Sequence, residues 1–338
     1  MDYIKKIFSK REISAFTFLI LLFLIVGLRN PDFFNSSSIS TVLKGSVLYI
    51  FLAIGMTFVL LTGGIDVSVG ATLGISAAIS ATMIRDGKNI ILSILIVLLI
   101  GIIIGFINGI GVSVIKVPAI IMTLGTMGII RVIMVIYTNG KWVENLPDNF
   151  KLMAQKTIFG FINIYFLIAL IMVILVQLYF SKSRTGKYFA AIGDNTEGAI
   201  LVGIPVKKYT IIAYTISGFT AAISGVVFAS QVGFVTSNSG LNLEMIAIAA
   251  CVLGGVSLSG GIGSVIGSLI GAITMTAINS ALIYLKVPSF FNKSIQGSLL
   301  IIIVVIDILI HKYLSEKAKK QRLSARTKIA LVGGKENE

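Results

Sequence analysis

Residues 89–115 read NIILSILIVLLIGIIIGFINGIGVSVI and carry no charged side chain. A helix of about 20 residues crosses the ~30 Å hydrocarbon core of a bilayer, so this stretch is long enough to span a membrane. Further apolar runs lie near residues 13–29, 40–61, 65–84, 117–137, 159–180, 210–230, 243–257, 263–285 and 294–311. We therefore expect an all-α polytopic membrane protein with about ten transmembrane helices.

Composition excludes a soluble globular protein, because 56% of the 338 residues are hydrophobic and only 12% are charged, against about 25% in soluble domains. The formal net charge of +14 would suit a nucleic-acid partner if the basic side chains shared one solvated face. They gather instead at the ends of apolar runs. We therefore expect a lipid bilayer around the chain and no nucleic acid bound to it.

Lysine and arginine concentrate in three polar segments, 1–12, 181–209 and 312–338. Cytoplasmic loops of membrane proteins carry an excess of these residues, so all three segments are expected in the cytoplasm. The domain plan is then a cytoplasmic N-terminal segment (1–12), a transmembrane domain (13–311) and a basic cytoplasmic tail (312–338). An even number of spans keeps both termini on one side and places residues 138–158 outside, despite the three lysines there.

The loop at residues 181–209 reads SKSRTGKYFAAIGDNTEGAILVGIPVKKY. Its centre has the pattern of a turn followed by a short amphipathic helix, which Asp194 or Asn195 could cap. A polar loop of this length in so apolar a chain indicates a docking element for a cytoplasmic partner.

Two pairs of stretches repeat in the same order along the chain. Residues 63–70 and 254–261 share the pattern G-G-x-x-x-S-x-G, and Ile-Asn followed by Lys-Val-Pro occurs at 107–118 and again at 278–288. The glycine-serine motif and the Ile-Asn motif are separated by ~20 more residues in the first half of the chain than in the second. This difference is about one membrane crossing, so one copy could be inverted relative to the other. The sequence thus predicts an internal repeat, and many transporters place the substrate path between such copies.

The segment TGGIDVSVG, residues 62–70, combines a carboxylate with glycines that disfavour a helix. Backbone groups left free at membrane depth must be buried in protein or line a wet cavity, so the segment indicates either a broken helix at a translocation path or close helix packing. A carboxylate in a bilayer is costly, so Asp66 should face a cavity, a partner or the interface. We take Asp66, Ser68, Asn108 and Asn279 as candidates for the path or its walls.

Two further charged residues lie in or beside apolar runs. Glu244 opens the run at 243–257, where a carboxylate would complement the dipole of a helix that begins at the outer interface. Arg131 lies within the run at 117–137 and could neutralise Asp66 or contact a polar ligand. Arg131 and Glu244 are therefore possible charge partners.

No residue pattern points to catalysis. The single cysteine, Cys251, lies in an apolar run, and the single histidine, His311, follows the last run, so no disulfide framework or metal cluster is expected. The sequence contains no G-x-x-x-x-G-K-[ST] phosphate loop, so the chain should not hydrolyse ATP itself. We expect no enzyme activity and no cofactor.

The predicted external loops, GKWVENLPDNF and QVGFVTSNSGLN, contain three aromatic residues, Trp142, Phe150 and Phe234. Aromatic residues at the membrane interface usually anchor the protein there. The alternative is a surface that receives an external carrier protein.

Three segments, LLTGGIDVSVG (60–70), AAIGDNTEGAILVGIPVKKY (190–209) and LEMIAIAACVLGGVSLSGGIGSVIGSLIGA (243–272), resemble the membrane permease subunits of ribose-type ABC importers. The similarity runs from about Phe33 to Asp307. YTNGKWVENLPD, SQVGFVTSNSGLNLEMIAIAACVLGG and KVPSFFN are most similar to the permeases of this family that import autoinducer-2.

The resemblance implies a subunit in a bacterial inner membrane, with two copies of an ATP-binding subunit, a second permease subunit and an extracytoplasmic substrate-binding protein as partners. It also implies a cargo, either autoinducer-2 or a monosaccharide such as ribose or rhamnose. Residues 141–149 would face the carrier protein. The loop that couples the permease to the ATPase would include Gly193, Asp194, Asn195, Glu197 and Gly203.

Two other classes of function remain open at this point. A secondary carrier driven by protons or sodium usually needs titratable groups deep in the membrane, of which this chain has few. It would also leave the loop at 181–209 without a necessary role. A membrane scaffold that transports nothing would leave the paired glycine-serine segments explained only as packing.

Overall fold

The computed structural model describes residues 11–158 and 161–291, together with residues 294, 295, 297, 298, 301, 302 and 305. The chain divides into a unit of residues 1–292 and a unit of residues 293–338, and all named elements belong to the first. The expected N-terminal segment 1–12, the tenth span at 294–311 and the tail at 312–338 lie wholly or largely outside the described residues.

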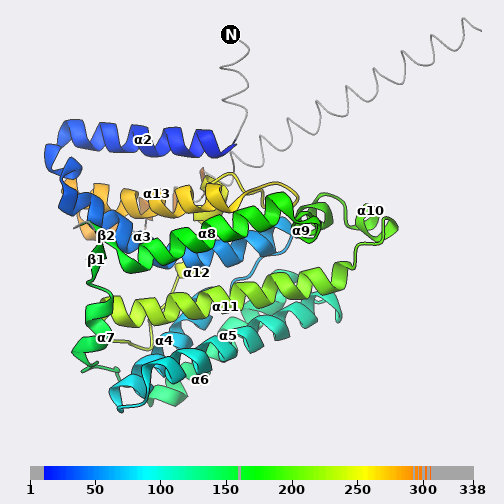
Figure 1. Cartoon of the computed structure of the whole chain (residues 1–338), viewed down its shortest axis with the longest axis horizontal. Coiled ribbons are helices and arrows are strands. Elements are labelled where there is room, and N and C mark those ends of the chain that lie inside the picture. The colour runs from blue at the N-terminus through cyan, green and yellow to red at the C-terminus, as the bar shows by residue number, and fades with distance from the viewer. Residues whose placement is uncertain are drawn as a thin grey trace, which may run out of the picture. The chain divides into compact units, whose positions relative to one another are not determined.

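The first unit is a bundle of helices with one short strand pair, and Figure 1 shows the long helices lying side by side. At one end of the bundle lie α9 and α10, and we call it the α10 end; the opposite end, with α7, β1 and β2, is the α7 end. The elements are α2 (Arg11–Arg29), η1 (Pro31–Phe34), α3 (Ser36–Leu61), α4 (Val69–Arg85), α5 (Ile90–Ser113), α6 (Ala119–Thr138), α7 (Asp148–Met153), β1 (Thr157–Ile158), β2 (Ile162–Asn163), α8 (Ile164–Lys182), α9 (Arg184–Asp194), α10 (Thr196–Leu201), α11 (Val206–Val232), α12 (Leu243–Leu253), α13 (Val265–Tyr284) and η2 (Ser289–Phe291).

Seven helices in the described part of the chain are long and apolar enough to cross a membrane: α2, α3, α5, α6, α8, α11 and α13. The apolar helices α4 and α12 are shorter, with 17 and 11 residues. Together these helices match nine of the ten expected runs and confirm the polytopic helical fold.

Polar caps and glycines set several helix bounds. The Oδ1 atom of Asn89 accepts hydrogen bonds from the backbone of Ile91 and Leu92 at the start of α5, and the Oγ atom of Ser264 accepts one from Gly267 N at the start of α13. Helix α11 ends at Gly233, whose φ of 82° suits glycine.

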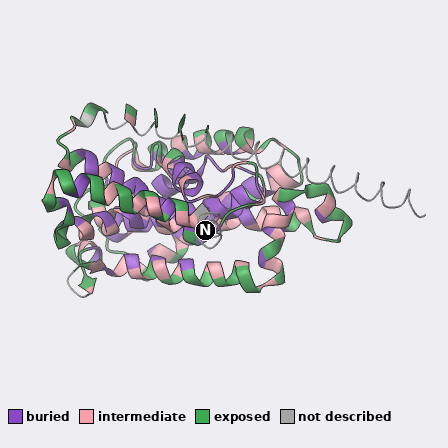
Figure 2. Cartoon of the chain, turned by 90° about the horizontal axis from the view of Figure 1, so that it is seen from above, coloured by how far each residue is buried: buried purple, intermediate pink, exposed green. Residues whose placement is uncertain are grey.

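Burial divides the helices into an inner and an outer group. Most residues of α3, α4, α11 and α12 are buried, whereas α2, α5, α6 and α8 expose many large apolar side chains. Figure 2 shows the same distribution, with buried residues gathered inside and exposed residues on the outer helices. Exposed isoleucine and leucine on the outer helices are suited to contact with lipid tails.

Two helices begin inside the bundle. Helix α3 ends at Leu61, and the chain runs through residues 62–68 without a long helix before α4; residues 233–242 separate α11 from α12 in the same way. The starts of α4 and α12 meet, because a Cβ atom added at Gly70 would overlap the Glu244 carboxylate. The segment TGGIDVSVG therefore interrupts the helix, and its Gly70 also packs closely, since an added Cβ would lie 2.5 Å from Gly240 O.

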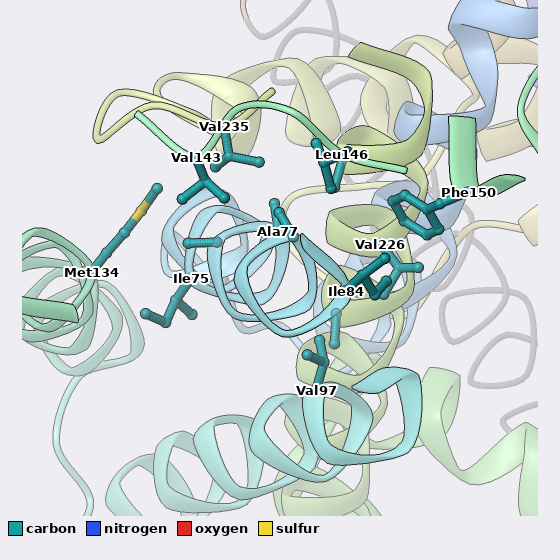
Figure 3. Close-up of a cluster of buried hydrophobic side chains, with 14 of the residues drawn as sticks. Ile75, Ala77, Ile84, Val97, Met134, Val143, Leu146, Phe150, Val226 and Val235 are labelled. Carbon is teal, nitrogen blue, oxygen red and sulfur yellow. The ribbon is translucent and has the colours of Figure 1, made fainter. Parts of the chain in front are cut away.

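From this meeting point the two half-helices run to opposite ends. Residues Ala77, Ala81 and Ile84 of α4 belong to a buried cluster at the α7 end that includes Val143 and Phe150. Figure 3 shows this cluster with Val143, Val235 and Leu146 lying over α4. Helix α12 instead leads through residues 254–261 to the α10 end, where Gly261 N donates to Leu61 O over 3.1 Å.

Helices α5 and α13 run in opposite directions, as an inverted repeat requires. Helix α5 ends at the α10 end and α13 begins there, and each is followed by a lysine in the left-handed conformation, Lys116 at φ 66° and Lys286 at φ 57°. The other end of α13 contacts the α2–η1 turn, where Asn30 Nδ2 donates to Tyr284 O over 3.2 Å. The Ile-Asn and Lys-Val-Pro motif therefore marks equivalent positions in antiparallel helices.

The glycine-serine motif, unlike the Ile-Asn and Lys-Val-Pro motif, does not mark equivalent positions in the two halves. Residues 63–70 follow α3, whereas residues 254–261 follow α12, so the two stretches are not equivalent in the inverted repeat. They lie instead at the same end and touch, with a Cβ at Gly260 placed 3.0 Å from Gly63 Cα.

Glycines also allow α5 and α11 to approach closely. The spacing of Gly101, Gly105 and Gly109 predicts close helix packing, and all three face α11. A Cβ at Gly105 would overlap Tyr214 O and lie 2.9 Å from Thr215 Cα.

We predict that Gly105→Leu destabilises the protein by about 1–3 kcal/mol, because overpacking forces backbones apart. Thermal unfolding of the purified protein in detergent measures the effect. Gly125→Leu on α6 is the matched control, since Gly125 has no heavy atom within 4 Å of an added Cβ. Equal melting temperatures for the two variants would contradict the α5–α11 contact.

Candidate functional site

A buried hydrogen-bond network surrounds Asp66. Its Oδ1 atom accepts from the backbone N of Ser68 at 3.0 Å and from the Ser68 hydroxyl at 2.6 Å, and its Oδ2 atom accepts from the Ser217 hydroxyl of α11 at 2.8 Å. Asn108 Nδ2 of α5 donates to Ser68 Oγ over 2.9 Å, and Thr126 Oγ1 of α6 donates to Asn108 Oδ1 over 2.6 Å. The network ties the break before α4 to three other helices.

The Asp66 carboxylate lies near the middle level of the bundle. Its partner Ser217 is 11 residues beyond Val206, the first residue of the 27-residue helix α11. At a rise of about 1.5 Å per residue, this is about 17 Å along a helix about 40 Å long. A carboxylate at this depth is costly unless it is fully hydrogen-bonded, and three donors meet that need.

The structure brings together three of the four proposed path residues, Asp66, Ser68 and Asn108, and places Asn279 on α13. It does not pair Arg131 with Asp66. The Arg131 guanidinium donates to Ser239 O over 2.7 Å and interacts electrostatically with Glu244. Glu244 does begin α12, but its side chain is only 4% exposed and faces the start of α4, so the expected position at the outer interface is wrong.

A cavity of about 350 Å³ opens near the Asp66 network at the α10 end. Its wall combines backbone of the break, Thr62 to Gly64, with polar side chains that include Ser113, Lys207 and Tyr214. Tyr214 links this wall to the break, because its hydroxyl donates to Ile65 O, next to Asp66, over 3.4 Å. The volume lies in the range of pockets that hold small molecules.

Helix α9 touches the end of α3 and the second glycine-serine segment, residues 254–261. A Cβ at Gly193 would overlap Leu61 O, and it would lie 2.6 Å from Gly261 N and 3.0 Å from Gly260 Cα. Phe189 and Ile192 of α9 are buried, and the Phe189 ring meets Phe58 of α3 edge-on at 5.0 Å. We call the meeting of Gly193, Leu61 and residues 260–261 the glycine junction.

The remaining loop residues have different roles. Asn195 Oδ1 accepts from Gly198 N over 2.9 Å, which confirms Asn195 as the cap of α10, and Asp194 ends α9 against Gly261. Glu197 and Gly203 lie at the exposed tip.

Sequence reasoning predicted a docking loop but did not single out an exposed apolar patch at its tip. Ile200, Leu201 and Val202 are consecutive exposed apolar residues, with Leu201 87% exposed. A run of three exposed apolar residues within the polar loop was the available signal. We call these three residues the α10 tip.

At the α7 end, Trp142 stacks on Phe234 with ring centroids 5.8 Å apart and planes 13° from parallel. Both rings are exposed, and a bridge between Val143 and Val235 joins their segments. Phe150 differs from the expectation for an interface aromatic, because it is 1% exposed and packs in the cluster of Figure 3.

Comparison with known proteins gives consistent results. Residues 38–304 match the family described as branched-chain amino acid transport system / permease component. The autoinducer 2 import system permease protein LsrC of Photorhabdus luminescens is 40% identical over 304 residues, which cover 90% of this chain and 92% of that protein. The LsrC proteins of Escherichia coli O9:H4 (strain HS) and Salmonella typhimurium (strain LT2) are each 38% identical over 319 residues, covering 94% of this chain and 93% and 92% of theirs. No solved structure matches.

We predict that Asp66→Asn lowers the melting temperature of the purified protein, because each hydrogen bond to a charged group contributes about 1.5–3 kcal/mol and an amide cannot accept all three. Asp86→Asn is the control, since Asp86 is exposed and pairs only with its neighbour Arg85 over 2.9 Å. An Asp66→Asn protein as stable as the control would mean that the carboxylate does not hold the break.

Proposed function

The chain belongs to the family of branched-chain amino acid transport system permease components, and from this membership we propose that it imports a small sugar-like solute as the permease subunit of an ATP-driven ABC importer. Autoinducer-2 is the first candidate cargo. The observation that carries this choice is the identity of 38–40% to LsrC proteins over at least 90% of both chains. Ribose, rhamnose and other monosaccharides are the alternative cargo.

The energy for import would come from other chains. The sequence has no phosphate loop, so we assign ATP hydrolysis to two copies of a separate ATP-binding subunit. The α10 tip offers those subunits an apolar contact on the polar loop at 181–209. A second permease subunit, identical or a sister chain, and an extracytoplasmic binding protein complete the proposed assembly.

The orientation follows from the charge distribution. The α10 end carries the basic loop at 181–209 and is proposed to face the cytoplasm, together with both termini, in a bacterial inner membrane. The α7 end would then face outside, where residues 141–149 and the stacked Trp142 and Phe234 would receive the binding protein.

The glycine junction suggests how movement would reach the path. A displacement of the α10 tip would move α9, whose Gly193 contacts Leu61 and residues 260–261. Residues 62–68 carry that movement toward Asp66, and residues 254–261 carry it toward α12. Both half-helices would therefore respond to the same ATPase movement.

An ion-coupled secondary carrier remains the rival from a different class. The interior does hold two carboxylates, Asp66 and Glu244, but the Asp66 oxygens are occupied by three donors. An ion-coupled carrier also gives no role to the exposed α10 tip.

We predict ATP-dependent uptake of autoinducer-2 by vesicles that contain this chain, its ATP-binding subunits, the second permease and the binding protein. Vanadate should stop uptake, and an ionophore that collapses ion gradients should not. Ribose and rhamnose in parallel assays identify the cargo. Uptake that needs an ion gradient but no ATP would contradict the proposal.

We predict that Leu201→Asp breaks the contact with the ATP-binding subunit, because it places a charge in an apolar interface. Loss of the ATPase upon affinity purification of the complex measures this. Leu152→Asp is the control, because Leu152 is also exposed but lies on α7 at the opposite end. Normal recovery of the ATPase with Leu201→Asp would show that the α10 tip is not the docking surface.

A separate change tests the glycine junction. In Gly193→Leu the added side chain would collide with Leu61 and Gly261, so we expect uptake to be abolished while membrane insertion is retained. Uptake assays and the amount of protein in washed membranes give the two readings. Normal uptake with the ATPase still bound would contradict the coupling role.

A further inference from the structure

Two charged side chains in the interior lack partners for some of their polar atoms. Among the described residues, six have buried side-chain nitrogen or oxygen atoms with no hydrogen-bond partner. Four of them are serine or threonine hydroxyls, and the other two are Arg131, at Nε and Nη2, and Glu244, at Oε2. No salt bridge within 4.0 Å joins these two residues in the described structure, although they interact electrostatically.

The two side chains lie along one face of α4. A Cβ at Gly70 would overlap Glu244 Oε2, and a Cβ at Gly74 would lie 3.5 Å from Arg131 Nη1. Gly70 and Gly74 are one helical turn apart on the same face. The segment that carries Glu244 is fixed beside them, because Arg131 Nη1 donates to Ser239 O over 2.7 Å.

Both half-helices begin at this place. The first residues of α4 and α12 are Val69 and Leu243, and the first turn of a helix presents backbone N–H groups without intrahelical acceptors. These groups carry partial positive charge, which stabilises the Glu244 carboxylate between them. The cluster therefore combines one anionic acceptor with guanidinium and amide donors.

Unpaired polar atoms on buried charged groups are costly, so binding of a ligand that forms hydrogen bonds with these atoms would be favoured. The opposite charges of Glu244 and Arg131 disfavour both a free cation and a free anion. A neutral solute with adjacent hydroxyl groups fits, because each hydroxyl can donate to the carboxylate and accept from the guanidinium.

We propose that Glu244 and Arg131 form a binding site in the translocation path for a neutral polyhydroxylated solute, the cargo in transit. The inference rests on the proposed import function and adds the residues that recognise the cargo. The site is separate from the 350 Å³ cavity, whose lining includes neither residue, and from the Asp66 network.

The test uses the complete transporter in vesicles, with labelled autoinducer-2 and ribose as the solutes. Glu244→Gln removes the charge at almost constant volume, and Arg131→Lys keeps the charge but loses the Nε donor and the planar fork. Each change should raise the KM for uptake about tenfold to a hundredfold, the expected effect of one lost hydrogen bond to a charged group.

Controls separate binding from structure. Asp86→Asn, an exposed carboxylate on the same chain, should leave KM unchanged. As a second measurement, autoinducer-2 should raise the melting temperature of the wild-type complex but not that of the complex that contains Glu244→Gln. If Glu244→Gln does not assemble, Arg131→Lys and Arg131→Gln carry the test, because Arg131 is only half-buried.

The outcomes are distinct. Wild-type uptake with unchanged KM in the Glu244 and Arg131 variants would overturn the site and leave the import function standing. Absence of ATP-dependent uptake of either solute by the wild-type complex would overturn the import function and the site with it.

Discussion

A backbone that leaves the helix at membrane depth must find its hydrogen bonds inside the protein, and this constraint organises the structure. Residues 62–68 meet it through Asp66, whose carboxylate accepts from Ser68 and from Ser217 of α11. Asn108 and Thr126 extend the network to α5 and α6. The inner helices therefore shield the break from lipid. The outer helices expose apolar side chains, which suit contact with lipid tails.

The same break brings two half-helices together. Helices α4 and α12 each begin inside the bundle, meet where Gly70 contacts Glu244, and run to opposite ends. Glycine makes the necessary contacts possible at Gly70, where α4 meets Glu244, and at Gly193, where α9 meets Leu61 and residues 260–261. A side chain at either glycine would separate the elements that an importer has to move together.

The sequence predicts the helices well, because membrane thickness imposes a length that apolar runs reveal directly. It also names Asp66, Ser68, Asn108 and Asn279 as candidates for the path, of which the structure brings the first three together, and it offers Asp194 or Asn195 as a helix cap, of which Asn195 is the cap. It could not show that residues 63–70 and 254–261 touch, since two similar motifs can be equivalent in a repeat or simply in contact. The sequence places the start of α12 correctly at residue 243, but it could not show the partner of Arg131 or the depth of Glu244, because both depend on how the non-helical residues 233–242 lie inside the bundle.

An inverted arrangement of the two halves requires α5 and α13 to be antiparallel across the membrane. Single cysteines at the exposed positions Lys116 and Lys286, in a Cys251→Ser background, test it through labelling of intact cells and of inside-out vesicles with a membrane-impermeant maleimide. With α5 and α13 antiparallel, we expect Lys116→Cys to be labelled only from the cytoplasmic side and Lys286→Cys only from outside. Labelling of both cysteines from the same side would contradict it.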